Sequence, residues 1–316
     1  MTIFFAAIAI LALALLAYAV RSLRTIGSKL SGLQTQQKKN FKEFERQVRI
    51  QQQEIKKMAL MNYLPFIESH KESWKFVVSI TSHSPRFDSL AEVLEALKLQ
   101  VLQPQKILLN IAHDEIAMLP SQVQELASSG FINIVATDDL GPAKKLIPTL
   151  GSHKDLPIIV IDDDLQFDPE LFLHLMVQHY LYPKAIIASR VHQVTTNVKG
   201  DLNRFDQWNK QHIASDGPAA DLMPTSGAGT LYPVGSLHPD AGDSDLYRQL
   251  SNYTDDLWWY FQARRNGTLV RRISGFSDLH FIDDSQKAGL WKNGNQDRNE
   301  SNLLNLVQKY GNPLNG

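Results

Sequence analysis

An uninterrupted apolar run stands near the start of the chain. Residues Ile3 to Val20 carry no charge and no proline, and a helix of about 18 apolar residues just spans the hydrocarbon core of a bilayer. We therefore expect a single-pass transmembrane anchor over residues 1–22. The nearest basic residues, Arg21, Arg24 and Lys29, follow the run, which by the positive-inside tendency places the rest of the chain in the cytoplasm. A cleaved signal peptide is the alternative, although the basic segment that normally precedes its apolar core is missing.

A polar stretch rich in Gln and Lys follows over residues 23–72. It lacks proline until Pro65, which favours one long helix from Ser28 to about Asn62. Five apolar residues in it fall at the a and d positions of a heptad, with Gln51 interrupting the seam: Phe41, Phe44, Val48, Ile55 and Met58. This pattern predicts a short coiled-coil stalk that would pair two chains into a homodimer, and a solvated helical spacer that does not dimerise explains it equally well.

The remainder, residues 73–316, alternates apolar strands with helical patterns. Strands are expected at 76–81, 106–111, 132–136, 157–161 and 186–189. Possible capping boxes at Ser89 with Glu92 and at Ser121 with Gln124 predict helix starts, as does Asp168 before Pro169. Later helices are expected at 255–266 and 300–310. The alternation predicts an α/β domain with a Rossmann-like, mostly parallel central sheet flanked by helices.

Composition narrows the classes of function. The chain has 316 residues and is 43% hydrophobic, enough for a sizeable core. Its 32 Lys and Arg against 33 Asp and Glu give a net charge of −1, so no global field would gather nucleic acid and we expect no nucleic-acid partner. The absence of cysteine removes disulfides, zinc-thiolate sites and cysteine nucleophiles.

The most informative segment is LPIIVIDDDLQFDPE, in which an apolar strand ends in Asp162, Asp163 and Asp164. Burying an unpaired carboxylate costs several kcal/mol, roughly, so three adjacent ones need a counter-charge. Open α/β sheets bind ligands at the carboxyl ends of their strands, and hard carboxylate oxygens suit Mg²⁺ or Mn²⁺ together with diphosphate oxygens. The segment therefore predicts a divalent-metal site, and an Asp-rich surface turn is the structural alternative.

At this point the chain from about Trp74 onward resembles the GT-A glycosyltransferases, particularly family-2-type bacterial enzymes and exostosin-like transferases. VVSITSHSPR looks like their opening nucleotide-binding strand, and the resemblance implies that Ser79, Thr81 and Arg86 lie near the base and ribose. VIDDDLQF looks like their DxD motif. It implies that Asp162 and Asp163 approach the ribose and the metal, and that Asp164 ligates the metal between the donor phosphates.

Further segments extend the resemblance. SGAGTLYPVGSLH, with Gly227 and Gly229, resembles the acceptor loop. In GPAKKLIPTL, either Lys144 or Lys145 would touch the donor nucleotide or its phosphates, because a diphosphate needs more positive charge than one metal supplies; both could also be solvated helix residues. His280 comes where related enzymes complete the metal shell with histidine, although a lone histidine is more often structural. Lys292 and Arg298 are weaker candidates for a phosphate contact.

YTDDLWWYF resembles the acidic pair at the acceptor side of these enzymes. Asp255 and Asp256 would then be the catalytic pair, with Asp256 as the general base that deprotonates the acceptor hydroxyl. Simple capping of a helix N-terminus also explains two carboxylates there. Adjacent helix residues point about 100° apart, so one of Trp258 and Trp259 can pack in the core while the other forms a wall for a sugar. Trp258 is the acceptor-binding candidate.

The sequence thus predicts a metal-dependent glycosyltransferase, moving a hexosyl or related group from a nucleotide-sugar donor to a cell-envelope glycan or lipid-linked acceptor. It would act at the inner face of a bacterial cytoplasmic membrane. Two alternatives belong to other classes. One is a metal-dependent phosphoesterase, which would turn over without a sugar acceptor. The other is a non-catalytic, membrane-anchored coiled-coil or glycan-binding protein.

Overall fold

The structure is a computed structural model that describes residues 74–276, 278–282 and 295–315, together with scattered positions between 21 and 69. The chain divides into two compact units, Met1–Pro65 and Phe66–Gly316. In the first, the described residues 31–33 and 36–40 are helical and exposed. The predicted anchor and the heptad positions Phe41, Phe44, Val48, Ile55 and Met58 lie outside the described residues, so the anchor, the stalk and the homodimer stay predictions.

Among the residues that the structure describes, no helix combines the length and apolarity needed to cross a membrane.

The second unit is built on a seven-stranded sheet in the order β10-β6-β9-β4-β1-β2-β3. Its first half consists of β1 (Val77–Thr81), β2 (Lys106–Ala112), β3 (Asn133–Thr137) and β4 (Ile158–Val160). β1 pairs in parallel with β2 and β4, and β2 pairs in parallel with β3. These strands lie where the apolar runs predicted them, and they confirm a mostly parallel α/β sheet.

The other half of the sheet contains short strands. β6 (Ile186–Ala188) was expected, whereas β9 (Thr230–Tyr232) and β10 (Val270–Arg272) were not. β9 runs antiparallel to both β4 and β6, and β10 runs parallel to β6. Four further short strands form two small ribbons: β5 (Leu165–Gln166) with β11 (His280–Phe281), and β7 (Val191–Gln193) with β8 (Leu222–Pro224).

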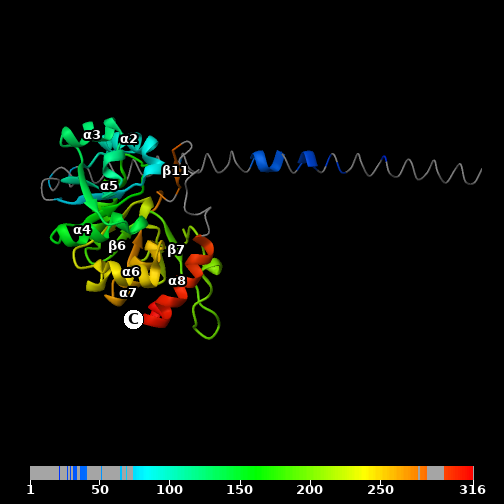
Figure 1. Cartoon of the computed structure of the whole chain (residues 1–316). Helices are drawn as coiled ribbons and strands as arrows, with labels where there is room; N and C mark the ends of the chain where they lie inside the picture. Colours follow the sequence, from blue (N-terminus) through cyan, green and yellow to red (C-terminus); the bar gives the residue numbers. More distant parts are fainter. Residues whose placement is uncertain are drawn as a thin grey trace, which may run out of the picture. The chain divides into compact units, whose positions relative to one another are not determined.

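Helices flank the sheet, and Figure 1 shows two groups of them at opposite ends of this unit. One end carries α2 (Phe87–Ala96) and α3 (Ser121–Ser128). The other carries α6 (Ser244–Ser251), α7 (Asp255–Arg265) and α8 (Asn295–Tyr310), which pack on one another. The remaining α-helices are α4 (Ile147–Ser152) and α5 (Leu171–Leu181). Single 3₁₀ turns occur at Ser84–Arg86, Leu97–Leu99, Ile116–Met118, Gly141–Lys145, Phe205–Gln207, Ser226–Ala228, Pro239–Gly242 and Pro313–Asn315.

The expected helix caps are wrong in detail although the helices exist. α2 begins at Phe87, before Ser89, whose hydroxyl donates to the Arg86 carbonyl instead. α3 follows Pro120 without a side-chain cap. Asp168 accepts a hydrogen bond from the Glu170 amide two residues on, and so closes the turn that precedes α5 rather than capping it. Ser and Asp side chains form such local turns readily, which is why their spacing misplaced the helix starts.

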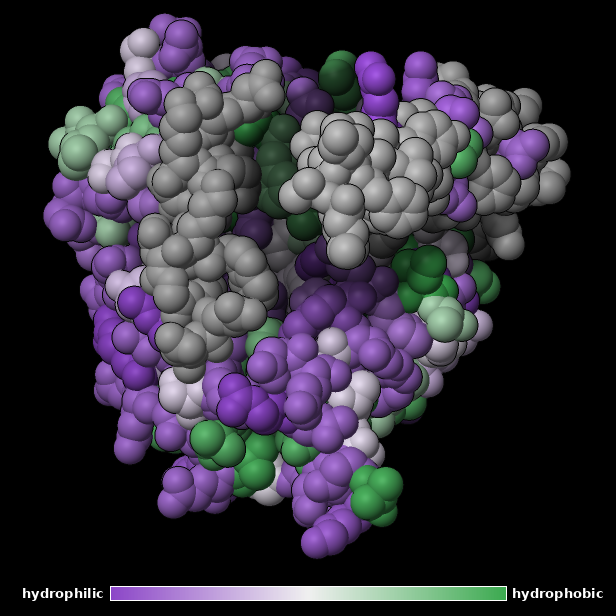
Figure 2. All heavy atoms as spheres, turned by 90° about the vertical axis from the view of Figure 1, so that its right-hand side faces the viewer, coloured by the Kyte–Doolittle hydropathy of each residue, from purple (hydrophilic) through white to green (hydrophobic). Residues whose placement is uncertain are grey.

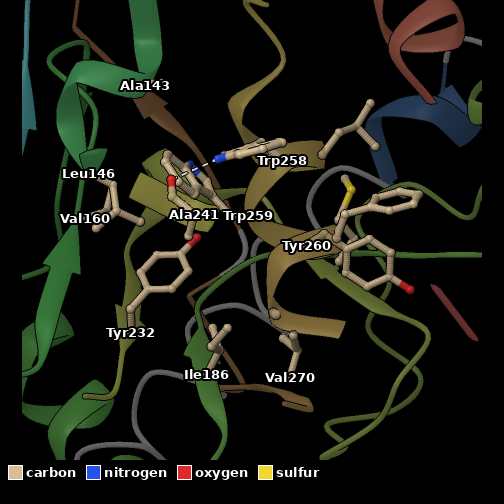
Figure 3. Close-up of a cluster of buried hydrophobic side chains, with 14 of the residues drawn as sticks. Ala143, Leu146, Val160, Ile186, Tyr232, Ala241, Trp258, Trp259, Tyr260 and Val270 are labelled. Atoms are coloured by element: carbon tan, nitrogen blue, oxygen red, sulfur yellow. Dashed lines mark hydrogen bonds between the residues drawn. The ribbon is translucent and has the colours of Figure 1, made fainter. Parts of the chain in front are cut away.

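An aromatic core joins α7 to the sheet. Trp258 and Trp259 are both fully buried, and Figure 3 shows them packed with Tyr260, Tyr232 of β9 and apolar residues of the neighbouring strands. The Trp258 indole N–H donates to the Ala241 carbonyl at 3.0 Å. Truncating a buried Trp side chain costs about 3–5 kcal/mol, so this core fixes α7 and the carboxylates at its start.

The face of the molecule shown in Figure 2 is mostly hydrophilic outside the residues drawn grey.

Candidate functional site

A cleft of about 910 Å³ opens at the carboxyl ends of β1 and β4. Thr81 at the end of β1 and Asp162 to Asp164 just after β4 line it, together with the loops before α4 and α7. Because parallel strands end at the same edge of the sheet, the topology alone brings these polar residues together. Seven carboxyl side chains and five lysine or arginine side chains are among the described residues that line it.

The aspartate triplet after β4 is held by protein cations. Asp163 accepts from the Ser82 hydroxyl at 2.5 Å and from the Arg86 guanidinium at 2.6 Å. The same guanidinium reaches Asp164 at 3.1 Å. Asp162 pairs with the Lys145 ammonium at 2.7 Å. Arg86 and Lys145 therefore supply part of the counter-charge that the three adjacent carboxylates need.

Lys145 connects the triplet with the second acidic pair. Its side chain is 5% exposed and lies 2.7 Å from Asp162 and 3.1 Å from Asp255. Although burial opposes it, the charges of Asp162, Asp255 and Asp256 raise the pKa of Lys145 well above its ordinary value. Lys144 is equally buried but pairs with Asp139 at 3.1 Å and lies 3.9 Å from Glu115. Neither lysine is a solvated helix residue.

Asp256 presents a carboxyl group of raised pKa to the cleft. The Ser226 amide donates to its Oδ1 at 2.8 Å. Burial, then the neighbouring Asp255, raise the pKa of Asp256 to about 7, against the lowering effects of Lys145 and that hydrogen bond. The N-cap of α7 is Thr254, whose side chain makes no capping hydrogen bond to the N–H groups of the helix. The two carboxylates contact Lys145 and Ser226, so capping does not account for them.

Gly227 determines how closely the backbone of its loop approaches Asp162. The Asp162 amide donates to the Gly227 carbonyl at 2.9 Å. A Cβ at position 227 would lie 1.7 Å from Asp162 Oδ2, which no side chain could occupy. The expected importance of this glycine therefore has a physical cause, namely room for the Asp162 carboxylate.

Four of the predicted site residues do not line the cleft: Ser79, Gly229, Trp258 and His280. The Ser79 hydroxyl is fully buried between Thr149 Oγ1 at 2.8 Å and Asn110 Nδ2 at 2.9 Å, so it holds the core rather than a nucleotide. Gly229 adopts φ +107° and packs against Leu171. Its role is conformational, because side-chain-bearing residues rarely adopt this φ.

The other two are displaced for different reasons. Trp258 is fully buried in the aromatic core, and the prediction that it contacts an acceptor is wrong. His280 lies exposed on β11 opposite Gln166, while its neighbours Leu279 and Phe281 line the cleft. Lys292 lies outside the described residues, and Arg298 is exposed and rests over the Tyr253 ring.

Sequence reasoning missed several cleft residues. Arg190 follows β6 as the aspartates follow β4, and a charge directly after the run Ile186 to Ser189 was a usable signal. Lys210 and His192 also line the cleft, but nothing in their irregular surroundings marks them. Tyr253 has φ +64°, an uncommon conformation for an aromatic residue, and its ring covers Gly141 at the cleft edge.

The excess of carboxylates over cations bears on metal binding. Burial and the neighbouring Asp162 raise the pKa of Asp164 to about 6, even though Arg86 acts in the opposite direction. In the part of the chain that the structure describes, no three His, Asp or Glu side chains are grouped as a ready-made metal cage. Mg²⁺ and Mn²⁺ commonly use one or two protein carboxylates plus substrate phosphates rather than such a cage. Asp162 and Asp164 fit that mode of binding.

Comparisons with known proteins give structural likenesses only. No protein-family model matches the chain, and no curated protein matches it in sequence. Among solved structures it is similar to the TarS fragment 1–349 of S. aureus in complex with UDP, at 13% identity over 65% of this chain and 60% of that one, with a TM-score of 0.44. It is also similar to glucosyl-3-phosphoglycerate synthase from Mycobacterium tuberculosis in complex with Mn²⁺, UDP and glucosyl-3-phosphoglycerate. There the identity is 14% over 39% of this chain and 46% of that one, with a TM-score of 0.29.

A third likeness is to 4-diphosphocytidyl-2C-methyl-D-erythritol synthase from Anaerococcus prevotii. It has 12% identity over 71% of this chain and 98% of that one, with a TM-score of 0.40. The chain thus spans less than two thirds of each of the first two structures. What the chain does is argued below from its own cleft.

Proposed function

We propose that the chain transfers a sugar from a nucleotide-sugar donor to an acceptor hydroxyl. One observation carries the proposal. At the carboxyl edge of the sheet, Lys145 joins the aspartate triplet to an acidic pair whose Asp256 has a pKa of about 7. A general base works best when its pKa lies near the working pH. A surface turn or a pair of helix caps would show neither the shared lysine nor the raised pKa.

The β1 side of the cleft is suited to the donor nucleotide. Thr81 and Arg86 line it at the end of β1, and Lys144 lines it from the next loop. Arg86 is positioned by its ion pairs with Asp163 and Asp164, so its guanidinium is pre-organised. Parallel sheets bind phosphates and ribose at this edge. We assign the nucleotide to this side and the sugar to the space near Asp162 and Lys145.

A divalent cation, Mn²⁺ or Mg²⁺, belongs to the proposal. Asp164 and Asp162 would hold it, because the carboxylate excess and the raised pKa of Asp164 both favour an added positive charge there. When bound it supplies charge neutralisation for a leaving diphosphate. His280 is left out of this assignment because it does not line the cleft.

The protein's own groups account for the proton. The acceptor oxygen forms a bond to the anomeric carbon of the donor sugar. The bond from that carbon to the diphosphate oxygen breaks, and its electron pair leaves with the diphosphate. Ionised Asp256 accepts the hydroxyl proton on its carboxylate, and the Ser226 amide at 2.8 Å keeps that carboxylate oriented. Arg86 and Lys145 offset part of the carboxylate charge around the leaving group.

The test is turnover by the full chain with UDP-, GDP- and CDP-sugars in the presence of Mn²⁺, followed by nucleotide release and by transfer to cell-envelope glycan or lipid-linked acceptors. Transfer that depends on the acceptor supports the proposal. Release of phosphate from simple phosphoesters without any acceptor would support the phosphoesterase instead. Binding of glycans with no turnover, unchanged by Asp256→Asn, would support a non-catalytic protein.

The cellular setting is a further proposal. We propose that residues 1–22 anchor the chain in a bacterial inner membrane with the catalytic unit on the cytoplasmic side, where nucleotide sugars are available. Two observations of the sequence support this: the uncharged run Ile3 to Val20, and the basic residues that follow it. Carbonate extraction of membranes, with protease accessibility of the catalytic unit in spheroplasts and inverted vesicles, tests both parts.

A further inference from the structure

The cations of the cleft fall into two sets. Arg86, Lys144 and Lys145 each form an ion pair with a carboxylate. Arg190 and Lys210 form none with any carboxylate that the structure describes, although both line the same cleft. The two unpaired cations therefore have charge available for a ligand.

Arg190 is held in place by its own backbone and by a neutral partner. It stands between β6 and β7, and its Nη1 donates to Thr225 Oγ1 at 3.1 Å. The Thr225 amide returns a hydrogen bond to the Arg190 carbonyl at 3.0 Å. The guanidinium Nε is buried and has no hydrogen-bond partner. A buried, unsatisfied N–H of a charged group is costly, and an oxyanion accepting from it would remove that cost.

Lys210 lies in the same part of the cleft. Its ammonium donates to the Phe205 carbonyl at 2.6 Å and sits over the Phe205 ring, 3.3 Å from its centre. Gln211, the next residue, has φ +52°, and its amide donates to His192 Nδ1 at 3.2 Å. Gln211 thus adopts an uncommon backbone conformation directly after Lys210, which lines the cleft.

Burial is the main cause of the lowered pKa values in this group. It lowers the pKa of Arg190, against the charge of Asp256. Burial, then Arg190 and Lys210, lower the pKa of His192 to about 3. Burial lowers the pKa of Lys210 to about 8, with Arg190 adding to the effect and Asp206 and Glu300 opposing it. Repulsion among these basic groups thus adds to burial at His192 and Lys210, and a bound anion would counter that repulsion.

The position relative to Asp256 indicates which substrate brings the anion. β6 is separated from β1 by β9 and β4, so Arg190 lies on the far side of the sheet centre from Thr81 and Arg86. Asp256 hydrogen-bonds Ser226 in the loop that begins at Thr225, the partner of Arg190. The unpaired cations are therefore on the side from which an acceptor hydroxyl would reach Asp256.

We propose that Arg190, with Lys210 beside it, binds an anionic group of the acceptor, a phosphate or a carboxylate. That the anion belongs to the acceptor rests on the proposed transfer reaction. Binding of an anion at this site can be measured without turnover.

The test is calorimetry of the full chain with three probes: inorganic phosphate, glucuronate and neutral glucose. Hydrogen bonds to charged groups contribute enough to make Arg190→Gln weaken binding of the preferred anion by about 10- to 100-fold. Lys210→Met should weaken it several-fold, and glucose should not bind comparably. Comparing phosphate with glucuronate distinguishes a phosphate group from a carboxylate group on the acceptor, because the probe that binds more tightly carries the matching group.

The matched control is Arg271→Gln, which removes an arginine of β10 that does not line the cleft. It should leave anion binding unchanged. Arg190→Lys, which keeps the charge, should bind more tightly than Arg190→Gln, and this separates loss of charge from a folding defect. All variants should keep nucleotide-sugar affinity within about twofold of the parent chain.

Three results would overturn the inference: no anion binding by the parent chain, anion binding unchanged in Arg190→Gln, or loss of nucleotide-sugar affinity in Arg190→Gln, which would assign the residue to the donor. If anions bind through Arg190 but no nucleotide sugar binds at all, the anion site stands while the proposed transferase fails. The two proposals are therefore distinguishable in one set of titrations.

Discussion

Replacing Lys145 by methionine tests the central link of the cleft. The ammonium is 5% exposed and lies 2.7 Å from Asp162 and 3.1 Å from Asp255, whose side chain is 11% exposed. Methionine keeps most of the volume and removes the charge. Breaking a buried pair from one side leaves an uncompensated carboxylate and costs about 3–5 kcal/mol. We expect Lys145→Met to lose that much unfolding free energy in a urea titration at neutral pH.

A second variant separates charge from packing. Lys145→Met with Asp255→Asn also removes Asp255, the more buried of the two carboxylates that lost their partner. About half or more of the lost stability should then return. Such a return is the interaction measured by a double-mutant cycle. Loss of less than about 1 kcal/mol in the single variant, or no recovery in the double variant, would refute the reasoning that the ion pairs hold the two acidic groups together.

The same substitution has a kinetic consequence. Lys145 lowers the pKa of Asp256, which burial and Asp255 raise to about 7. Without the lysine that pKa rises further, and Asp256 must be ionised to accept a proton. The lower limb of the pH-rate profile should therefore move to higher pH in Lys145→Met. An unchanged limb would mean that Asp256 is not the group that limits the rate at low pH.

Four further predictions concern single residues. Gly227→Ala should lower nucleotide-sugar affinity by about tenfold or more, because the new Cβ would lie 1.7 Å from Asp162 Oδ2. Gly151→Ala is the control: its Cβ has open space around it, so this variant should match the parent chain in the same titration. Asp256→Asn should reduce kcat by roughly 10²- to 10⁴-fold with donor binding retained. The raised pKa of Asp256 favours the protonated form of the folded state. The unfolding free energy of the parent chain, measured relative to Asp256→Asn, should therefore fall by about 2–4 kcal/mol as the pH rises from the ordinary carboxyl pKa of 3.8 to about 7. If denaturation at several pH values shows that this difference stays flat or rises, the burial argument is contradicted. Trp258→Phe should lower stability without changing any acceptor KM, since the indole is enclosed in the core.

The central strands and the site at their ends could be predicted from sequence for a physical reason. Residues 158–161 are buried in a mostly parallel sheet, so they form a continuous apolar run that is visible without the structure. Charges placed directly after such a run must emerge at the sheet edge, which located Asp162 to Asp164. The same reasoning applied to Ile186 to Ser189 would have located Arg190.

The rest depended on contacts that spacing cannot reveal. β9 and β10 have three residues each and take their identity from pairing with β4 and β6, so periodicity could not find them. Lys144 and Lys145 both look like solvated residues in sequence, yet both are buried beside carboxylates: Asp139 in the same loop for Lys144, and Asp162 after β4 for Lys145. Ser79 was expected near the nucleotide because its strand resembles the opening strand of GT-A enzymes, yet only the end of that strand reaches the cleft.

The prediction of a metal at the aspartate triplet left out the protein's own cations. Asp162 to Asp164 were expected to require a cation, and the structure gives them Arg86 and Lys145. The remaining excess of carboxylates and the raised pKa of Asp164 still favour a divalent ion. The ion then adds to the protein cations rather than replacing them, so donor binding should be strengthened by metal and not wholly created by it.

The most direct measurement is calorimetry of the full chain with UDP-, GDP- and CDP-sugars, each with Mn²⁺ present and absent. The account predicts that one nucleotide class binds, that Mn²⁺ tightens its binding about tenfold or more, and that Asp164→Asn removes most of this metal effect. Binding that ignores Mn²⁺ would contradict the assignment of Asp164 and Asp162 to a cation. Failure of every nucleotide sugar to bind in either condition would contradict the proposed function itself.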